Sequence, residues 1–198
     1  MSITSSSPLK LSPPLVDFFI LLDIIIMSYI NSFKGRYSFL SNFYPCEIEH
    51  KGITYPSVEH YYVALKVTSM QFIDGVYYTA PDFRELISKI KEPGDVKKIG
   101  RKAKIRSDWD EKKLGFMEWG VREKFKDDKL AEMLLSTGDL DLIEGNNWHD
   151  VWWGQCSCPK CKGGGHNYLG KILMQIRSEL RQQNTRPSIE EEIKNKLK

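Results

Sequence analysis

Apolar residues recur at intervals of three and four along most of the chain, the spacing that places side chains on one face of a helix. The longer patterns predict helices over residues 81–92, 107–125 and 167–183, and shorter ones predict helices over 57–66, 95–104 and 127–138. Their predicted buried stripes contain Phe83, Leu86, Ile87 and Ile90; Val96, Ile99 and Ala103; Leu114, Met117, Val121 and Phe125; and Leu169, Ile172, Leu173, Ile176 and Leu180.

Residues that favour helix ends mark several of these boundaries. Ser57 and Asn167 are typical N-cap residues before the first and the last predicted helix. Asp108 and Glu111 have the spacing of a capping box, and Gly138 suits the end of the helix that precedes it. The helices of this chain therefore begin and end at points that the sequence itself indicates.

Strand-like segments are short and few. Lys51 and Gly52 form a turn between two short runs, a pattern typical of a β-hairpin. Residues 67–80 predict a loop with one strand-like piece, and residues 140–145 suit a strand or an extended entry to a loop. Together these patterns predict an α+β fold: a mostly helical single domain with a few short strands.

The 198-residue chain is long enough for one domain with its own core. We expect this domain to cover residues 27–183 and to include a cysteine-rich loop at 155–166, followed by a charged tail at 184–198. We expect residues 1–26 to be an extension upstream of a translation start at Met27.

Residues 14–27 are strongly apolar, but two aspartates interrupt the run and it is too short for a membrane span. The segment also lacks the basic start and small-residue cleavage site of a signal peptide. A docked peripheral segment, or contact with a membrane surface through residues 15–27, remains the alternative to an upstream extension. We expect no membrane partner.

Net charge and cysteine content bear on whether this chain is a nucleic-acid binder or a disulfide-stabilised protein. The formal net charge is +3, from 29 Lys and Arg against 26 Asp and Glu, which is too weak to indicate a nucleic-acid binder by itself. The four cysteines form no pattern of a disulfide framework, because three of them crowd together and Cys46 stands alone. A reducing cytoplasmic location is therefore expected.

The segment YPSVEHYYVALK, residues 55–66, places a carboxylate in the first turn of a helix and an ammonium group two turns later. The free N–H groups and the dipole at a helix start favour an ionised Glu59. Tyr62 and Lys66 follow on the same side of the helix. Such a carboxylate can stabilise a developing sugar cation or activate the water that attacks it. From spacing alone, the simpler interpretation is a favourable helix start with a solvated lysine.

Two further segments carry groups that suit a phosphate-bearing, aromatic ligand. NNWHDVWWG, residues 146–154, surrounds Asp150 with tryptophans; Asp150 could be the second carboxylate of glycosidic chemistry, or an Asx-turn residue in a loop held by buried rings. In KKIGRKAKIR, residues 97–106, Lys97, Arg101 and Lys104 share one helix side. This face could meet phosphates, or it could simply be solvated.

The segment CSCPKCKGGGH, residues 156–166, is a candidate metal site. Cys156, Cys158, Cys161 and His166 match a Cys₃His zinc set in residue type. Their spacing is tighter than in most structural zinc sites, and either Cys46 or His149 could replace His166 as fourth ligand. Four protein ligands would make the zinc structural, since no coordination position stays open. The alternative is a reduced, flexible insertion.

Taken together, the motifs resemble those of the NADAR, or YbiA-like, domain family over residues 33–180. In order they are FLSNFYP, GITYPSVEHYYVALK, IGRK, WDEKKLGFM, LLSTGDLDLIEGN, VWWG and NYLGKILMQIR. The resemblance implies hydrolysis of an N-glycosidic bond to ribose. Members of this family act on phosphoribosyl-linked intermediates of riboflavin biosynthesis, and others are linked to ADP-ribose, including its removal from guanine bases.

The resemblance also implies roles for particular residues, and no cofactor for catalysis. Glu59 would stabilise the sugar cation, with Asp150 as its catalytic partner. Lys66 and Arg101 would neutralise a phosphate or the leaving group. The remaining substrate contacts would be stacking by Phe43, Trp109 and Trp153 and polar contacts by Asn42 and Asn167.

This chain departs from the family pattern in three segments. Residues 67–80 look longer than in the simplest members, the cysteine cluster replaces a short glycine-rich stretch, and residues 1–26 have no counterpart. The substrate would be a small ribosyl phosphate, an ADP-ribosyl compound or ADP-ribosylated nucleic acid. The alternative function is a binding module for ADP-ribose or nucleic acid, with a zinc-stapled loop, that does not cut its ligand.

Overall fold

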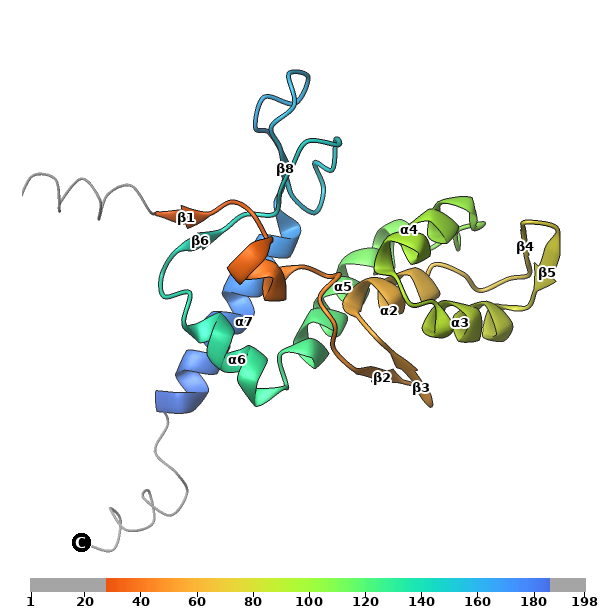
Figure 1. Ribbon diagram of the computed structural model, residues 1–198, viewed down its shortest axis with the longest axis horizontal. Helices are drawn as coiled ribbons and strands as arrows, with labels where there is room; N and C mark the ends of the chain where they lie inside the picture. The colour runs from red at the N-terminus through yellow and green to blue at the C-terminus, as the bar shows by residue number, and fades with distance from the viewer. Residues whose placement is uncertain (1–27, 186–198) are drawn as a thin grey trace, which may run out of the picture.

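The computed structural model describes residues 28–185 (Figure 1). The expected extension 1–26, and the tail beyond residue 185, lie outside the described residues. In chain order the elements are β1 (Tyr29–Ile30), the 3-10 helix η1 (Gly35–Leu40), β2 (Ile48–His50), β3 (Ile53–Tyr55), α2 (Val58–Ala64), β4 (Gln71–Ile73), β5 (Val76–Tyr78), α3 (Ala80–Lys89), α4 (Pro93–Lys102), α5 (Trp109–Lys124), α6 (Asp128–Leu135), β6 (Asp141–Leu142), β7 (Gly145–Asn146), β8 (Gln155–Cys156) and α7 (Tyr168–Thr185).

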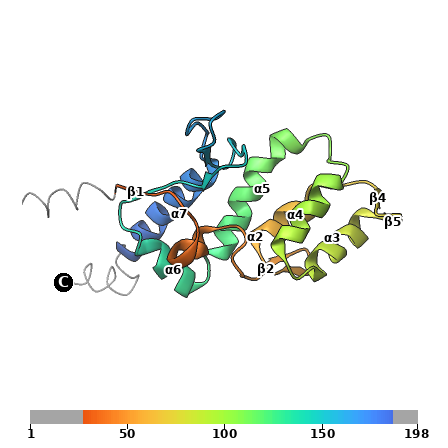
Figure 2. The same cartoon turned by 45° about the horizontal axis from the view of Figure 1, so that its top comes forward.

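Helix α5 runs through the middle of the molecule. In Figures 1 and 2 it lies between α2, α3 and α4 on one side and α6 and α7 on the other. Helix α2 packs against α3, α4 and α5, while α7 packs against α5 and α6. The predicted stripes supply much of this core, although Leu114 is 37% exposed and Leu86 is only partly buried. The expected α+β class, mostly helical with short strands, is confirmed.

Local sequence explains how the first half of the domain turns back on itself. Lys51 and Gly52 both have positive φ, 53° and 76°, which joins β2 and β3 as the predicted antiparallel hairpin. The predicted N-cap Ser57 then begins α2, since its side chain accepts a hydrogen bond from the His60 backbone N–H. This short helix is buried along its whole length, so its polar residues lie inside the domain.

The other strand pairs depend on residues far apart in sequence. β1 pairs with β6 in parallel, and β7 pairs with β8 in parallel. The second pair closes the loop of residues 147–154, and the chain continues from β8 into the cysteine-rich loop, which projects next to it (Figure 1). Residues 67–80 contain the hairpin β4–β5, where only one strand-like piece was predicted.

Two predicted helix starts are wrong in detail. Asp108 precedes α5, but its carboxylate binds the Arg106 guanidinium instead of forming a capping box with Glu111. Asn167 precedes α7, but its side-chain oxygen accepts from the Glu144 backbone N–H. In both cases a partner outside the helix competes successfully for the side chain.

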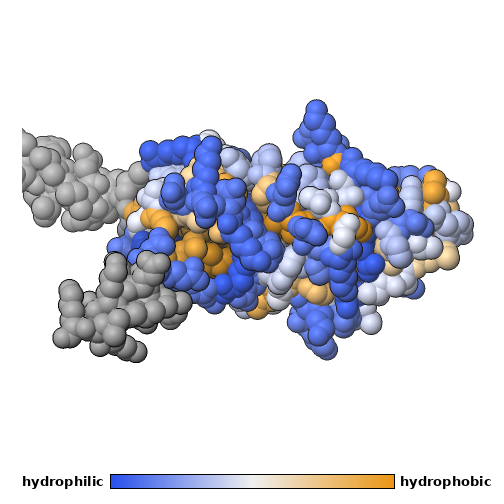
Figure 3. Space-filling model, turned by 90° about the horizontal axis from the view of Figure 1, so that it is seen from below, coloured by the Kyte–Doolittle hydropathy of each residue, from blue (hydrophilic) through white to orange (hydrophobic). Residues whose placement is uncertain are grey.

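The face shown in Figure 3 is mostly hydrophilic, with apolar atoms in separate small areas. Several exposed apolar side chains of the described residues belong to or adjoin the hairpin β4–β5, among them Met70, Phe72 and Tyr77. Within residues 28–185, no helix is both long enough and apolar enough to cross a membrane.

Candidate active site

A cavity of about 970 Å³ lies where α2, α4, α5, the loop after η1 and the loop of residues 144–153 meet. Every predicted catalytic or substrate-binding residue except Asn167 lines it. Segments separated by a hundred residues are thus brought to one cavity, large enough for a nucleotide-sized ligand.

The segment SNF, residues 41–43, is fixed to the floor of this cavity from two helices. The Asn42 carbonyl accepts a hydrogen bond from the Glu59 backbone N–H at 3.0 Å, and the Asn42 amide contacts Met117 Sδ at 3.2 Å. The buried Lys124 ammonium donates to the Ser41 carbonyl at 2.7 Å, and burial lowers its pKa to about 8. Nothing in the local sequence pattern indicated this role of Lys124.

Glu59 projects from the first turn of α2 and is only 7% exposed. Burial raises its pKa, and the charges of Lys97, Lys66 and Arg101 oppose this rise while that of Asp150 adds to it. Desolvation thus opposes the ionised form that the helix start was expected to favour, and ionisation of Glu59 stays a prediction. The neighbouring cations are what favour its charged form.

The cationic side of the cavity is formed by α2 and α4. Lys66 Nζ lies 5.5 Å from the centre of the Tyr62 ring, and burial lowers the pKa of its ammonium group. Lys97 Nζ lies 5.7 Å from the Phe43 ring and 5.9 Å from the Trp148 ring. These positions suit an anionic ligand with an aromatic part.

Gly100 allows α4 to approach α2 closely enough to place these cations. A Cβ atom at Gly100 would lie 2.8 Å from Val63 Cγ1, nearer than side chains normally approach. The next residue, Arg101, is exposed and lines the cavity. The glycine-arginine pair therefore combines close helix packing with a charge at the cavity mouth.

Aromatic rings lie next to these cations in the cavity. The Tyr62 ring centre lies 4.9 Å from that of Trp109 and 5.6 Å from that of Trp153, so the three rings support one another. Phe43 and Trp148 are 39% and 48% exposed, which leaves their faces open to a ligand. Tyr62 and Trp148 were not among the predicted substrate contacts, although both lie in the motifs that were singled out.

Asp150 lines the cavity and also holds its own loop. Its Oδ1 atom accepts a hydrogen bond from the Trp153 N–H at 2.9 Å, which closes a local turn one residue longer than the predicted Asx turn. Its carbonyl accepts from the Asn146 amide at 2.8 Å. The turn and a catalytic role are compatible, because the turn engages one carboxylate oxygen.

Glu144 is a third cavity carboxylate, which the sequence did not reveal. Its Oε2 atom is buried without a hydrogen-bond partner. Burial, with the Asp150 charge adding to it, raises the pKa of Glu144 to about 7. The preceding residues have the alternating pattern of a strand, and that pattern gave no indication that this side chain faces a cavity.

Asn167, predicted to contact substrate, does not line the cavity. Its side-chain oxygen accepts from the Glu144 N–H at 3.0 Å, and its side-chain nitrogen donates to the Leu142 carbonyl at 2.8 Å. Its own φ of 52° is left-handed, a region that asparagine tolerates better than most residues. Asn167 therefore holds the backbone that carries Glu144, and its contact with substrate stays a prediction.

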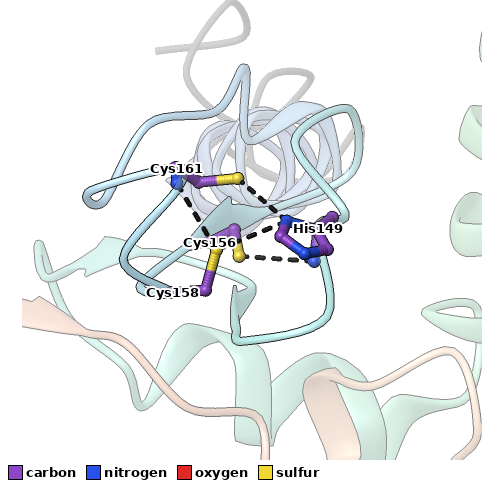
Figure 4. A group of neighbouring side chains, drawn as sticks. All are labelled: His149, Cys156, Cys158 and Cys161. Atoms are coloured by element: carbon purple, nitrogen blue, oxygen red, sulfur yellow. Dashed lines mark hydrogen bonds between the residues drawn. The ribbon is translucent and has the colours of Figure 1, made fainter.

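The cysteine cluster forms a separate group beside the cavity (Figure 4). The ligand atoms of His149, Cys156, Cys158 and Cys161 all lie within 4.8 Å of one another, so the group could hold a metal ion. His166 was expected as the fourth member, but its ring instead stacks on Tyr168 with the centres 5.3 Å apart. Cys46 packs against the hydrophobic core.

Several relatives share most of this chain. N-glycosidase YbiA of Escherichia coli K12 is 32% identical over 164 residues, which cover 81% of this chain and 91% of that protein. An N-glycosidase of Nostoc punctiforme is 35% identical over 148 residues, with 73% and 86% covered. A riboflavin biosynthesis protein of Vibrio vulnificus is 34% identical over 150 residues, and the chain spans only 36% of its length.

The fold agrees with these similarities. The solution structure of Escherichia coli YbiA superposes with a TM-score of 0.62 at 29% identity, covering 81% of this chain and 90% of that one. The NADAR domain model matches residues 29–181, which contain every residue of the cavity described above. The chain therefore belongs to the NADAR domain family.

Proposed function

We propose that this protein hydrolyses the bond between a ribose C1′ carbon and a nitrogen atom in a phosphate-bearing substrate. The observation that carries the proposal is one cavity with three carboxylates, Glu59, Asp150 and Glu144, facing a cationic side and open aromatic rings. The names of the related N-glycosidases and riboflavin biosynthesis protein support the same chemistry.

The proposed reaction separates charge at C1′. As the C1′–N bond breaks, its electron pair leaves with nitrogen and ribose gains oxocarbenium character. In its ionised form, which the charges of Lys97 and Lys66 favour, Glu59 would stabilise this cation. Water adds to C1′ and gives its proton to Asp150 or Glu59, while the leaving nitrogen takes a proton from Glu144. A pKa of about 7 leaves Glu144 partly protonated at neutral pH, as a general acid requires.

The substrate is proposed to be a nucleotide-like molecule. Lys66, Lys97 and Arg101 would bind its phosphate groups, since ammonium and guanidinium groups form strong charge-assisted hydrogen bonds with phosphate. Phe43, Trp109 and Trp153 would contact the flat heterocycle, and Asn42 a ribose hydroxyl. Two classes fit: phosphoribosyl intermediates of riboflavin biosynthesis, and ADP-ribose attached to guanine, either free or in nucleic acid.

No step of this reaction draws on a cofactor. A metal ion at the cysteine cluster would be structural, because four protein ligands fill its coordination sphere. We further propose that the catalytic unit is residues 27–183 and that the protein works in the cytoplasm, without a membrane partner.

The test is incubation of the purified protein with each substrate class, with the released base or sugar phosphate identified by mass spectrometry. Release from one class and not the other assigns the substrate. Tight binding of both ligands without release over hours would contradict hydrolysis and favour the binding-module alternative. The exposed rings of Phe43 and Trp148 make that alternative worth measuring in the same experiment.

A further inference from the structure

Four potential ligand atoms outside the cavity lining converge, one from His149 in the loop of residues 147–154 and three from the cysteine-rich loop. His149 Nδ1 lies 3.3 Å from Cys158 Sγ and 3.3 Å from Cys161 Sγ, and no two ligand atoms of the group are more than 4.8 Å apart. Tetrahedral zinc, with Zn–S about 2.3 Å and Zn–N about 2.0–2.1 Å, requires ligand atoms roughly 3.5–3.8 Å apart. The distances from His149 Nδ1 to the two sulfur atoms are therefore within a few tenths of an ångström of those in a zinc tetrahedron.

Backbone N–H groups near the cysteines are directed at two of the thiol sulfur atoms. The Cys161 N–H points to Cys158 Sγ at 3.4 Å, and the His149 N–H points to Cys156 Sγ at 3.3 Å. Cys156 is further fixed by backbone bonds with Gly163 and Gly164. N–H groups directed at sulfur orient it and support metal–thiolate bonds.

Side-chain packing gives this loop little support. Residues 155–166 contain no large aliphatic residue and, apart from the exposed His166, no ring, and Cys156 is their one buried side chain. A segment without a core needs another source of order, and a structural metal is the usual one in cysteine-rich loops. The convergence of three thiols and an imidazole in such a segment is what a metal site would require.

We propose that one Zn²⁺ ion is bound by His149, Cys156, Cys158 and Cys161. This ion orders the loop of residues 147–154, part of which lines the cavity. His149 lies between Trp148 and Asp150, which both line the cavity. Its φ of 68° is left-handed, a conformation that needs support in a non-glycine residue. A bond from zinc to the His149 ring supplies that support at the point where the metal site and the cavity join.

Asn146 forms hydrogen bonds both to the loop of residues 147–154 and to the cysteine-rich loop. Its buried side-chain oxygen accepts from the backbone N–H groups of Trp148 and Asp150, at 3.3 and 3.2 Å. Its carbonyl accepts from the Ser157 N–H at 2.8 Å, next to Cys156 and Cys158. Displacement of the thiols on metal loss would therefore reach the cavity by two routes, through His149 and through Asn146.

Metal content of the purified protein, measured by mass spectrometry after expression with added zinc, tests the ligand set. We expect about one zinc ion per chain. His149→Ala and Cys158→Ser should lose it, while the matched variants His166→Ala and Cys46→Ala should retain it. With Co²⁺ in place of zinc, the wild type should show thiolate charge-transfer and tetrahedral d–d bands. Absence of both zinc and these bands, or zinc loss in His166→Ala but not in His149→Ala, would overturn the assignment.

Hydrogen exchange of the wild-type protein, followed by mass spectrometry, tests the coupling. Removal of zinc with a chelator under reducing conditions should abolish amide protection over residues 147–150, and added zinc should restore it. Unchanged protection there after proven zinc removal would contradict an ordering role. Neither readout involves base release, so both results stand whether or not the protein is a hydrolase.

Discussion

Replacement of Glu144 by glutamine should stabilise the protein at alkaline pH and at the same time slow base release. Burial raises the Glu144 pKa from its usual 4.5 to about 7, so the folded protein holds this proton more tightly than the unfolded chain does. The stabilising contribution of the protonated group is complete below pH 4.5 and is lost as the pH rises through about 7. A neutral amide has no such pH dependence.

The size of the effect follows from the shift. The rise from 4.5 to about 7 corresponds to about 3.4 kcal/mol at 1.36 kcal/mol per unit, as an upper value before screening by solvent. Most of this cost is present at pH 8 and only about a quarter of it at pH 5. Glu144→Gln should therefore gain about 2 kcal/mol more stability, relative to wild type, at pH 8 than at pH 5.

Urea unfolding of both proteins at the two pH values measures this difference. Glu49→Gln, a change at an exposed position of β2, is the matched control and should behave alike at both pH values. If Glu144 also donates a proton to the leaving nitrogen, its variant should release base about 10²–10⁴-fold more slowly. A stability difference that does not vary with pH would refute the buried, protonated state of Glu144.

Three other changes test the packing and charge of the site. Lys97→Ala removes the cation that most lowers the Glu59 pKa, so the acid limb of the pH–rate profile should move to higher pH. Lys97→Arg should leave this limb in place. An unmoved limb in the alanine variant would contradict the pairing of Lys97 with Glu59. Gly100→Ala should lower the free energy of unfolding in urea by about 1 kcal/mol. Overpacking against Val63 costs about 1–3 kcal/mol, and about 1 kcal/mol is regained in helix propensity. Gly115→Ala, with open space around it, should be neutral or stabilising. Asn167→Ala should lower the free energy of unfolding by about 2 kcal/mol or more, because it leaves the Glu144 N–H and the Leu142 carbonyl without their partner. A normal melting temperature with only a raised KM would instead support its predicted role in substrate binding.

The sequence predicts local structure well where one short segment decides it. Ser57 begins α2 and Lys51–Gly52 turns the hairpin because capping and positive φ depend on neighbouring residues alone. The apolar stripe of α7 is buried as its spacing predicts, with Leu169 and Leu173 almost fully inaccessible.

Interactions between distant segments could not be predicted in this way. Asp108 and Asn167 both have the residue type of a helix cap, but Arg106 and the Glu144 backbone offer them other partners. The parallel pairs β1–β6 and β7–β8 join residues whose proximity no local pattern records.

The residues of the candidate site were likewise predictable only in part. Residue types and family motifs indicated Glu59, Asp150 and the aromatic residues of the cavity, since chemistry limits which side chains can serve. They missed Glu144, whose burial results from packing, and they put His166 first in a metal set in which the folded chain places His149, the alternative they had named. The direction of the Glu59 pKa shift also depends on burial, which helix position alone does not give.

The most direct test of the proposed chemistry is base release by Glu59→Gln, measured on the substrate that the wild type cleaves. We expect the rate to fall about a hundredfold or more, while the melting temperature and the rate of the control Glu49→Gln stay close to wild type. A Glu59→Gln protein that releases base at the wild-type rate would contradict stabilisation of the ribosyl cation by this buried carboxylate.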